Sequence, residues 1–318
     1  MSSGPRFVVF GEALTDFIRE GDHHWRSVPG GSCWNVARAA ARLGVPTGYA
    51  GAVSRDLFGD ELFRLTVEAG LDMRYTQRVA KSPLLAMVVS KDPPRYFFVG
   101  DDSADVNFDL EALPRDWLAD AELVYFGCIS LVRQPHAARL VALAERVHAA
   151  GKRVCFDPNY RNLMDGPGYR ETLVRMARIA DFVKASSEDL AHLFPSARQD
   201  AIRELRALAP RAAILLTDGA AGMRLLADGR EVFQPAFPFE VVDTVGAGDA
   251  SMGGWMASVL STPNAPLEAH VAFASATAAV VCGHSGAYAP TRAEVEALLR
   301  GMTGPPARSQ RRGPARRS

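Results

Sequence analysis

The chain has 318 residues, 48% of them hydrophobic, which is enough to bury the core of one large domain. Lysine plus arginine number 36, as do aspartate plus glutamate, so overall charge gives no argument for nucleic acid or an anionic membrane as partner. No apolar run is long enough to cross a bilayer, and no signal peptide is visible. The four scattered cysteines suit reduced core residues of a cytoplasmic protein.

Strands and helices alternate along most of the chain. Apolar, β-branched runs between turn residues predict strands, and apolar residues three or four apart predict helices. On these grounds we expect strands at 6–14, 45–54, 123–127, 153–157, 181–185 and 212–217, and helices from 35 to 44, at 56–69, 135–150, 169–180, 187–194, 201–208 and 266–282, and from 291 onward. This alternation predicts a mainly parallel sheet covered by helices on both faces.

Some segments depart from this pattern. We expect an exposed hairpin between residues 16 and 28, and a small β appendage, interpreted as a lid, from a second hairpin at 86–99. The acidic residues that follow are interpreted as solvated turn residues; they are Asp101, Asp102 and Asp105. The basic tail 307–318 is expected to be disordered, with a nucleic-acid-binding arm as the alternative.

The stretch 243–249, DTVGAGD, precedes an apolar helical segment. Its two glycines allow a sharp turn that presents backbone N–H groups at the positive end of a helix dipole, a common phosphate site. Asp249 is a poor neighbour for a phosphate, but it makes sense as a base that takes a proton from an attacking hydroxyl. The alternative is a plain turn with Asp249 as an N-terminal cap, and this stretch alone leaves both open.

A second glycine pair, Gly30 and Gly31, precedes another predicted helix and lets a ligand approach the backbone. Asn35 could bind a sugar hydroxyl or cap that helix, and capping is favoured on this segment alone. Polar turns after several strands would meet at one edge of the sheet, where open α/β sheets bind ligands. The chain has no P-loop, dinucleotide fingerprint, nucleophile elbow or zinc pattern.

Two separated motifs carry a family resemblance. Gly30-Gly31 with Asn35-Val-Ala and Leu43-Gly44, followed by DTVGAGD at 243–249, resemble the signature regions of the ribokinase (PfkB) family of carbohydrate kinases. GEAL at 11–14 with Asp16, and FDPNYR at 156–161, are similar to its fructokinase branch. The resemblance covers about residues 6–299. It implies a ribokinase-like three-layer α/β/α fold over 1–306, with a β-sheet lid from about 12–30 and 73–100, followed by the tail 307–318.

The resemblance implies transfer of the ATP γ-phosphate to a hydroxyl of a sugar, with fructose as the first candidate. It implies Mg²⁺ as a cofactor and allows a site for K⁺. Asp249 would be the base, and the amides of Gly246, Ala247 and Gly248 would form the anion hole. The residues implied for the sugar are Asp16, Gly30, Gly31, Asn35 and Arg161. Those implied for the nucleotide are Thr217, Gly219, Gly222, Thr244, Gly246, Gly248, Cys282 and Gly286. Asp243 is implied for the monovalent cation and Asp189 for Mg²⁺ through water.

The chain departs from the family where an N-x-x-E motif is frequent, because it has SSED at 186–189. Within the family, 2-keto-3-deoxygluconate, ribose or a nucleoside are alternative acceptors. A non-catalytic sugar- or nucleotide-binding homologue is the alternative from another class. Composition and charge lead us to expect a cytoplasmic protein without nucleic acid or membrane as partner, whereas the resemblance implies a sugar and ATP as partners and allows a homodimer through the lid.

Overall fold

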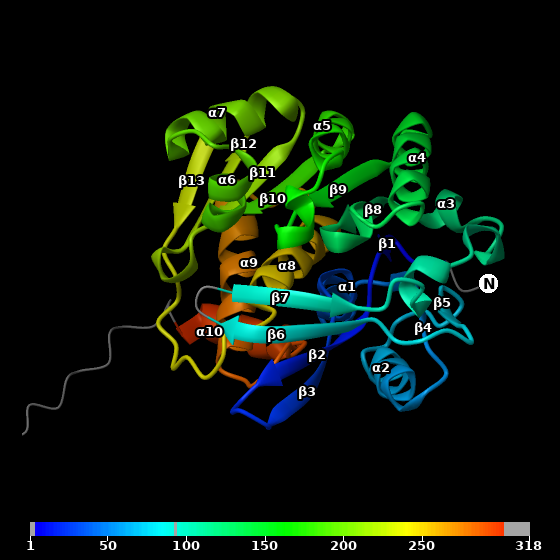
Figure 1. The fold of residues 1–318 in the computed structure, drawn as a ribbon. Helices are drawn as coiled ribbons and strands as arrows, with labels where there is room; N and C mark the ends of the chain where they lie inside the picture. Colours follow the sequence, from blue (N-terminus) through cyan, green and yellow to red (C-terminus); the bar gives the residue numbers. More distant parts are fainter. Residues whose placement is uncertain (1–3, 92–93, 302–318) are drawn as a thin grey trace, which may run out of the picture.

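The computed structural model describes residues 4–91 and 94–301, and within them two sheets share the chain (Figure 1). The larger has nine strands in the order β13-β12-β11-β10-β9-β8-β1-β4-β5. Its strands are β1 (Phe7–Phe10), β4 (Thr47–Val53), β5 (Thr76–Arg78), β8 (Leu123–Gly127), β9 (Arg153–Asp157), β10 (Phe182–Ser186), β11 (Ala213–Thr217), β12 (Met223–Ala227) and β13 (Arg230–Gln234). Neighbours from β5 to β11 pair in parallel, and the two pairings among β11, β12 and β13 are antiparallel.

The smaller sheet has four strands in the order β3-β2-β6-β7. They are β2 (Leu14–Arg19), β3 (Trp25–Gly30), β6 (Leu85–Lys91) and β7 (Pro94–Val99). β2 and β3 form one antiparallel hairpin, β6 and β7 form another, and the two hairpins join through the parallel pair β2–β6. The predicted hairpins are thus confirmed, and together they make one sheet.

Helices cover both faces of the large sheet. Successive side chains of a strand point to opposite faces, and both sets are apolar in β1, so each face needs a cover. In β1, Phe7 and Val9 belong to one apolar cluster, and Val8 and Phe10 belong to the other. The first cluster includes residues of α1 (Ser32–Arg42), α2 (Leu57–Glu68), α8 (Ala247–Ser261), α9 (Leu267–Cys282) and α10 (Arg292–Gly301). The second includes or is contacted by residues of α3 (Trp117–Asp120), α4 (His136–Ala149), α5 (Tyr169–Ile179), α6 (Ser187–Leu193) and α7 (Arg198–Leu208).

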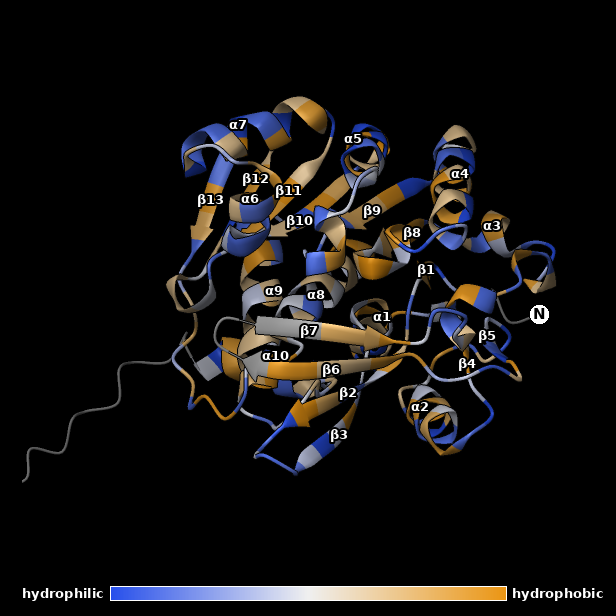
Figure 2. Ribbon diagram, viewed as in Figure 1, coloured by the Kyte–Doolittle hydropathy of each residue, from blue (hydrophilic) through white to orange (hydrophobic). Residues whose placement is uncertain are grey.

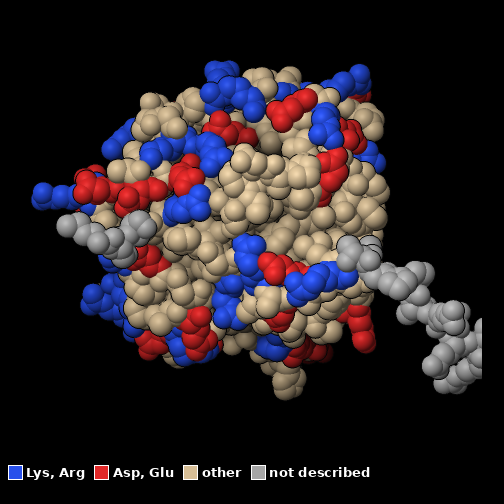
Figure 3. All heavy atoms as spheres, turned by 180° about the vertical axis from the view of Figure 1, so that it is seen from behind, with Lys and Arg blue, Asp and Glu red and all other residues tan. Residues whose placement is uncertain are grey.

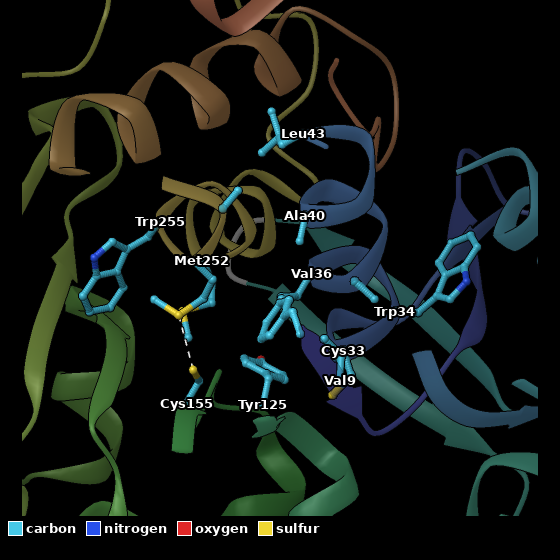
Figure 4. Packing of buried hydrophobic residues seen from close by; sticks show 14 of the residues in the cluster. Val9, Cys33, Trp34, Val36, Ala40, Leu43, Tyr125, Cys155, Met252 and Trp255 are labelled. Carbon is cyan, nitrogen blue, oxygen red and sulfur yellow. Dashed lines mark hydrogen bonds between the residues drawn. The ribbon is translucent and has the colours of Figure 1, made fainter. Parts of the chain in front are cut away.

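The helix α8 lies in the middle of the first cluster. Figure 4 shows Val36 and Ala40 of α1 facing Met252 of α8, with Tyr125 of β8 beneath them. Every residue of α8 from Asp249 to Leu260 is buried, so this helix is enclosed on all sides, unlike a surface helix. Figure 2 shows the contrast, with α5 and α7 carrying both hydrophilic and hydrophobic residues. Packing on several sides fixes α8, and with it the turn at its first residue.

The predicted alternation of strands and helices is confirmed, and two details are corrected. The helix expected from residue 35 begins at Ser32, so Asn35 lies inside it and is not its cap; Gly31 occupies the cap position. Asp105, expected in solvent, is only 3% exposed, because its Oδ2 lies 2.5 Å from Arg133 Nη1 in an ion pair. The predicted tail 307–318 lies outside the described residues.

Within residues 4–91 and 94–301, no helix combines the length and the apolar character needed to cross a membrane. On the face seen from behind, basic and acidic residues are interspersed and neither sign dominates (Figure 3). The surface view therefore matches the balanced composition.

Candidate active site

A cleft of about 1440 Å³ lies between the small sheet and the carboxyl ends of β9, β10 and β11. Ligands bind at this edge in open α/β sheets. The volume exceeds the ~300–1,000 Å³ of a typical small-molecule pocket, so two substrates can share it. Most residues predicted for the site line the cleft; these are Asp16, Gly31, Asn35, Arg161, Thr217, Gly219, Gly222, Asp243, Thr244, Gly246, Ala247, Gly248, Asp249 and Cys282.

The DTVGAGD stretch forms a tight turn into α8. Gly246 occupies the cap position with φ of 80°, a left-handed conformation that favours glycine. A Cβ there would lie 2.9 Å from the Cβ of Ala287. No side chain caps this end of the helix, and Gly246, Ala247 and Gly248 all line the cleft; the N–H of Ala247 donates to the Thr244 carbonyl at 3.2 Å. Such a turn at the positive end of a 15-residue helix can hold a phosphate.

Asp249 is the third residue of α8 and is buried. Its Oδ1 accepts hydrogen bonds from the Ser32 hydroxyl at 2.7 Å and from Asn159 Nδ2 at 3.3 Å. Its Oδ2 accepts one from Asn35 Nδ2 at 2.9 Å. The carboxylate therefore does not cap the helix, and that alternative is wrong; its bonds run to side chains from α1 and from the turn after β9.

The start of α1 lies against the small sheet at Gly31, whose φ is 109°. A Cβ on Gly31 would lie 2.7 Å from the carbonyl oxygen of Glu12, so only glycine fits between these backbones. This close approach places Asn35, one turn into α1, beside Asp249. Gly30, by contrast, ends β3 and does not line the cleft.

Asp16 of β2 and Arg161 lie on opposite walls of the cleft. Burial raises the pKa of Asp16 to about 7, and the positive charge of Arg161 opposes part of that rise. The Nη1 group of Arg161 donates to Asn159 Oδ1 at 2.9 Å and to the Tyr160 carbonyl at 2.6 Å. These bonds hold the guanidinium against the turn that carries Asn159.

Sequence reasoning missed Ser32, Asn159 and Lys184, which all line the cleft. A signal existed for the first two. Ser32 directly follows the glycine pair, and Asn159 lies inside the motif at 156–161 that carried the resemblance. Lys184 gave no signal, because a lysine inside a predicted strand has no pattern that distinguishes a buried position from an exposed one.

At the other end of the cleft, Thr217 ends β11, Gly219 and Gly222 form the next turn, and Cys282 ends α9. Gly286 does not line the cleft, but its N–H donates to Asp243 Oδ2 at 3.1 Å. Asp243 Oδ1 accepts from the N–H of Val245 at 3.2 Å. These bonds tie the turn before α8 to the loop after α9.

Asp189 lies at the start of α6 in a capping box with Ser186. Its Oδ2 accepts from the Ser186 N–H and its Oδ1 from the Tyr160 N–H, both at 2.6 Å. Among the described residues, no group of three or more histidine, cysteine or acidic side chains could hold a metal by itself. Isolated carboxylates fit Mg²⁺, which is typically bound through one or two carboxylates, waters and substrate phosphates.

Known proteins resemble this chain over most of its length. A family model described as pfkB family carbohydrate kinase matches residues 5–294. A fructokinase from Klebsiella pneumoniae is 32% identical over 259 residues, which cover 79% of this chain and 83% of that protein.

Two solved structures share the fold. A fructokinase from Xylella fastidiosa with bound ATP has a TM-score of 0.83 at 27% identity, covering 94% of this chain and 100% of that one. The aminoimidazole riboside kinase from Salmonella enterica, complexed with aminoimidazole riboside and an ATP analogue, has a TM-score of 0.79 at 28% identity, covering 92% and 99%. With the family model matching nearly the whole described chain, the protein belongs to the pfkB family of carbohydrate kinases and is a sugar phosphotransferase.

Proposed function

We propose that this protein transfers the γ-phosphoryl group of ATP to a hydroxyl of fructose, with Asp249 as the general base. The observation that carries the proposal is the position of Asp249, which lies in the cleft directly after the uncapped turn at Gly246–Gly248. A turn that can bind the transferred phosphate and a carboxylate that can accept a proton thus lie next to each other. The fructokinase relatives support fructose as the sugar.

In this proposal the sugar lies between the small sheet and α1. Asp16 and Asn35 offer an acceptor and a donor for its hydroxyls, Gly31 allows the backbone to approach closely, and Gly30 leaves room for the Asp16 carboxylate. Because Asn35 already bonds Asp249, a sugar held by Asn35 would present a hydroxyl to the base. Arg161 would face the substrate from the opposite wall.

For the transfer, the sugar hydroxyl oxygen attacks the γ-phosphorus while the bond to the β–γ bridging oxygen breaks and ADP leaves. Asp249 takes the proton of the attacking hydroxyl. The amides of Gly246, Ala247 and Gly248 stabilise the negative charge on the transferring group. Phosphoryl transfer depends mainly on such positioning and charge neutralisation.

The nucleotide would extend from this turn along Thr217, Gly219, Gly222, Thr244 and Cys282, with Gly286 supporting the turn through Asp243. We propose Asp189 as a water-mediated ligand of Mg²⁺ and Asp243 as a ligand of a monovalent cation. When bound, Mg²⁺ would neutralise charge on the phosphates. Each carboxylate oxygen of Asp189 accepts one hydrogen bond from a backbone N–H and keeps a second lone pair that can accept a hydrogen bond from an ordered water.

A riboside is the second candidate acceptor, because the aminoimidazole riboside kinase has nearly the same similarity to this chain as the fructokinase structure. The two candidate acceptors differ in size, because the riboside carries an aminoimidazole group that fructose lacks. They can therefore be separated by a direct comparison of substrates.

The test is release of ADP from ATP and Mg²⁺ with fructose, ribose, 2-keto-3-deoxygluconate, a nucleoside and aminoimidazole riboside. We expect the highest kcat/KM with fructose. Asp249→Asn should lower kcat by about 10²–10⁴-fold, the usual contribution of a general base, while the variant still binds an ATP analogue. Preference for a riboside would replace the proposed acceptor, and near wild-type turnover by Asp249→Asn would remove Asp249 as the base.

A further inference from the structure

A buried ion pair joins β9 and β10 at the floor of the cleft. Lys184 Nζ lies 3.0 Å from Asp157 Oδ2, and the two side chains are only 3% and 0% exposed. Taking two charges out of water is costly, and an apolar pair in their place is often as stable or more stable. Stability therefore does not explain why a lysine and an aspartate occupy this position.

The ammonium group of Lys184 lies directly behind the turn that begins α8. A Cβ built on Gly248 would lie 3.4 Å from Lys184 Nζ, so no other side chain separates the ammonium from the backbone of that glycine. Lys184 also lines the cleft. Its positive charge therefore adds to the field of the N–H groups at the uncapped end of the helix.

The charges around Lys184 keep it protonated. Burial by itself would lower its pKa, but the carboxyl groups of Asp157 on β9, Asp189 on α6 and Asp249 on α8 raise it above the usual value. The pKa of Asp16 on β2, which burial raises, is lowered by the charge of Arg161 and raised by that of Asp249. Lys184 is thus the buried cation among several acids that border a site for a highly negative nucleotide.

The same ion pair is connected to Asp249 through hydrogen bonds. Asp157 Oδ1 accepts from the N–H of Asn159 at 3.0 Å. The side-chain amide of Asn159 donates to Ser32 Oγ at 2.6 Å and to Asp249 Oδ1 at 3.3 Å. Lys184 therefore fixes Asp157, Asp157 fixes the turn at Asn159, and that turn helps to orient Asp249.

We propose that Lys184 is a positioning residue for phosphoryl transfer, whose ammonium supports negative charge at the Gly248 turn from behind and whose ion pair with Asp157 orients Asp249. This inference rests on the proposed kinase function. It assigns Lys184 and Asp157 a part in nucleotide binding and in turnover, although neither has to touch the substrate.

The cleanest test compares Asp157→Asn with the double variant Lys184→Met/Asp157→Asn. Asparagine removes the titrating carboxyl and keeps an oxygen that can accept the Asn159 N–H. The two variants then differ by one buried positive charge, because the carboxyl groups of Asp189 and Asp249 still raise the pKa of Lys184 in Asp157→Asn. With a non-hydrolysable ATP analogue and Mg²⁺ in titration calorimetry, we expect the double variant to bind about tenfold more weakly than Asp157→Asn, the scale of one partly screened charge.

A second readout is the pH dependence of kcat/KM. We expect the acid limb of the double variant at higher pH than that of Asp157→Asn, because the positive charge of Lys184, which interacts with Asp249, has been removed. If Lys184 had only a structural role, its removal would lower the melting temperature without shifting the acid limb. Lys152→Met is the matched control; Lys152 donates to the Ala119 carbonyl at an exposed position, and its removal should change neither quantity.

Equal analogue affinity and an equal acid limb in the two variants would overturn the proposal. If the double variant does not fold, Asp157→Asn alone remains informative. Its Lys184 ammonium is no longer paired with Asp157, so this variant should bind the analogue more tightly than wild type does at pH 8. No gain in affinity there would count against Lys184. Should wild type bind the analogue but phosphorylate no sugar, the proposed function fails while the affinity comparison still tests Lys184.

Discussion

At the residue scale, the carboxylate of Asp249 is held by uncharged donors. The hydroxyl of Ser32 and the amides of Asn35 and Asn159 supply the hydrogen bonds found at its two oxygens. Uncharged donors fix the direction of a carboxylate with less stabilisation of its ionised form than an arginine partner would give. This arrangement suits a group that must take up a proton during each turnover.

Asp16 gives a prediction about pH. Burial raises its pKa to about 7, so the carboxylate that accepts hydrogen bonds from a sugar is present above that pH and becomes protonated below it. With that pKa we expect the Kd for fructose, measured by calorimetry without nucleotide, to be about tenfold higher at pH 6 than at pH 8.

Asp16→Asn is the control for this prediction, because an amide does not titrate in this range. Its affinity for fructose should be weaker than that of wild type at pH 8 and nearly independent of pH. A wild-type Kd that stays constant from pH 6 to pH 8 would show that the ionised form of Asp16 does not bind the sugar.

At the element scale, the first residue before α8 determines the shape of the anion-binding turn. Gly246→Ala would combine a left-handed backbone with a Cβ 2.9 Å from Ala287. We expect a loss of about 1–3 kcal/mol in the free energy of unfolding, the usual cost of such strain. We also expect at least tenfold weaker binding of an ATP analogue, because the turn must shift. Thermal unfolding and calorimetry measure the two effects.

Gly229→Ala supplies the matched control. Gly229 lies in the turn between β12 and β13 with φ of 73°, and no atom lies within 4 Å of a Cβ built there. This variant carries a similar backbone strain without the clash, so it should lose stability and keep its affinity for the analogue. Equal losses of affinity in both variants would mean that strain alone, and not the shape of the turn at Gly246, explains the result.

The elements of this fold are predictable from local pattern, while the partners of the site residues are not. Apolar periodicity and glycine turns place the strands and helices, and the two motifs place Asp249 and Asn35. Pattern cannot show that Asn35 lies inside α1 beside Asp249, since that depends on how α1 packs against α8. The same limit applies to Asp105, whose burial follows from an ion pair with Arg133, a residue 28 positions away.

At the scale of the whole molecule, the cleft is bordered by two sheets with different surroundings. The large sheet has helices on both faces, whereas the small sheet has one side on the cleft. Apolar side chains of the small sheet line the cleft, and two of them are exposed, Val89 at 42% and Phe97 at 62%. Apolar surface of this kind is available to be covered when substrates are bound.

We therefore predict that the small sheet closes over the cleft when sugar and nucleotide are both present, because phosphoryl transfer to a hydroxyl requires exclusion of competing water. With fructose and a non-hydrolysable ATP analogue together, the radius of gyration from small-angle X-ray scattering should decrease. Amide hydrogen exchange should slow in β2 and β6. Each ligand alone is the control and should give a smaller change. An unchanged radius and unchanged exchange with both ligands bound would show that the small sheet is a fixed wall of the site, and water would then have to be excluded by the substrates themselves.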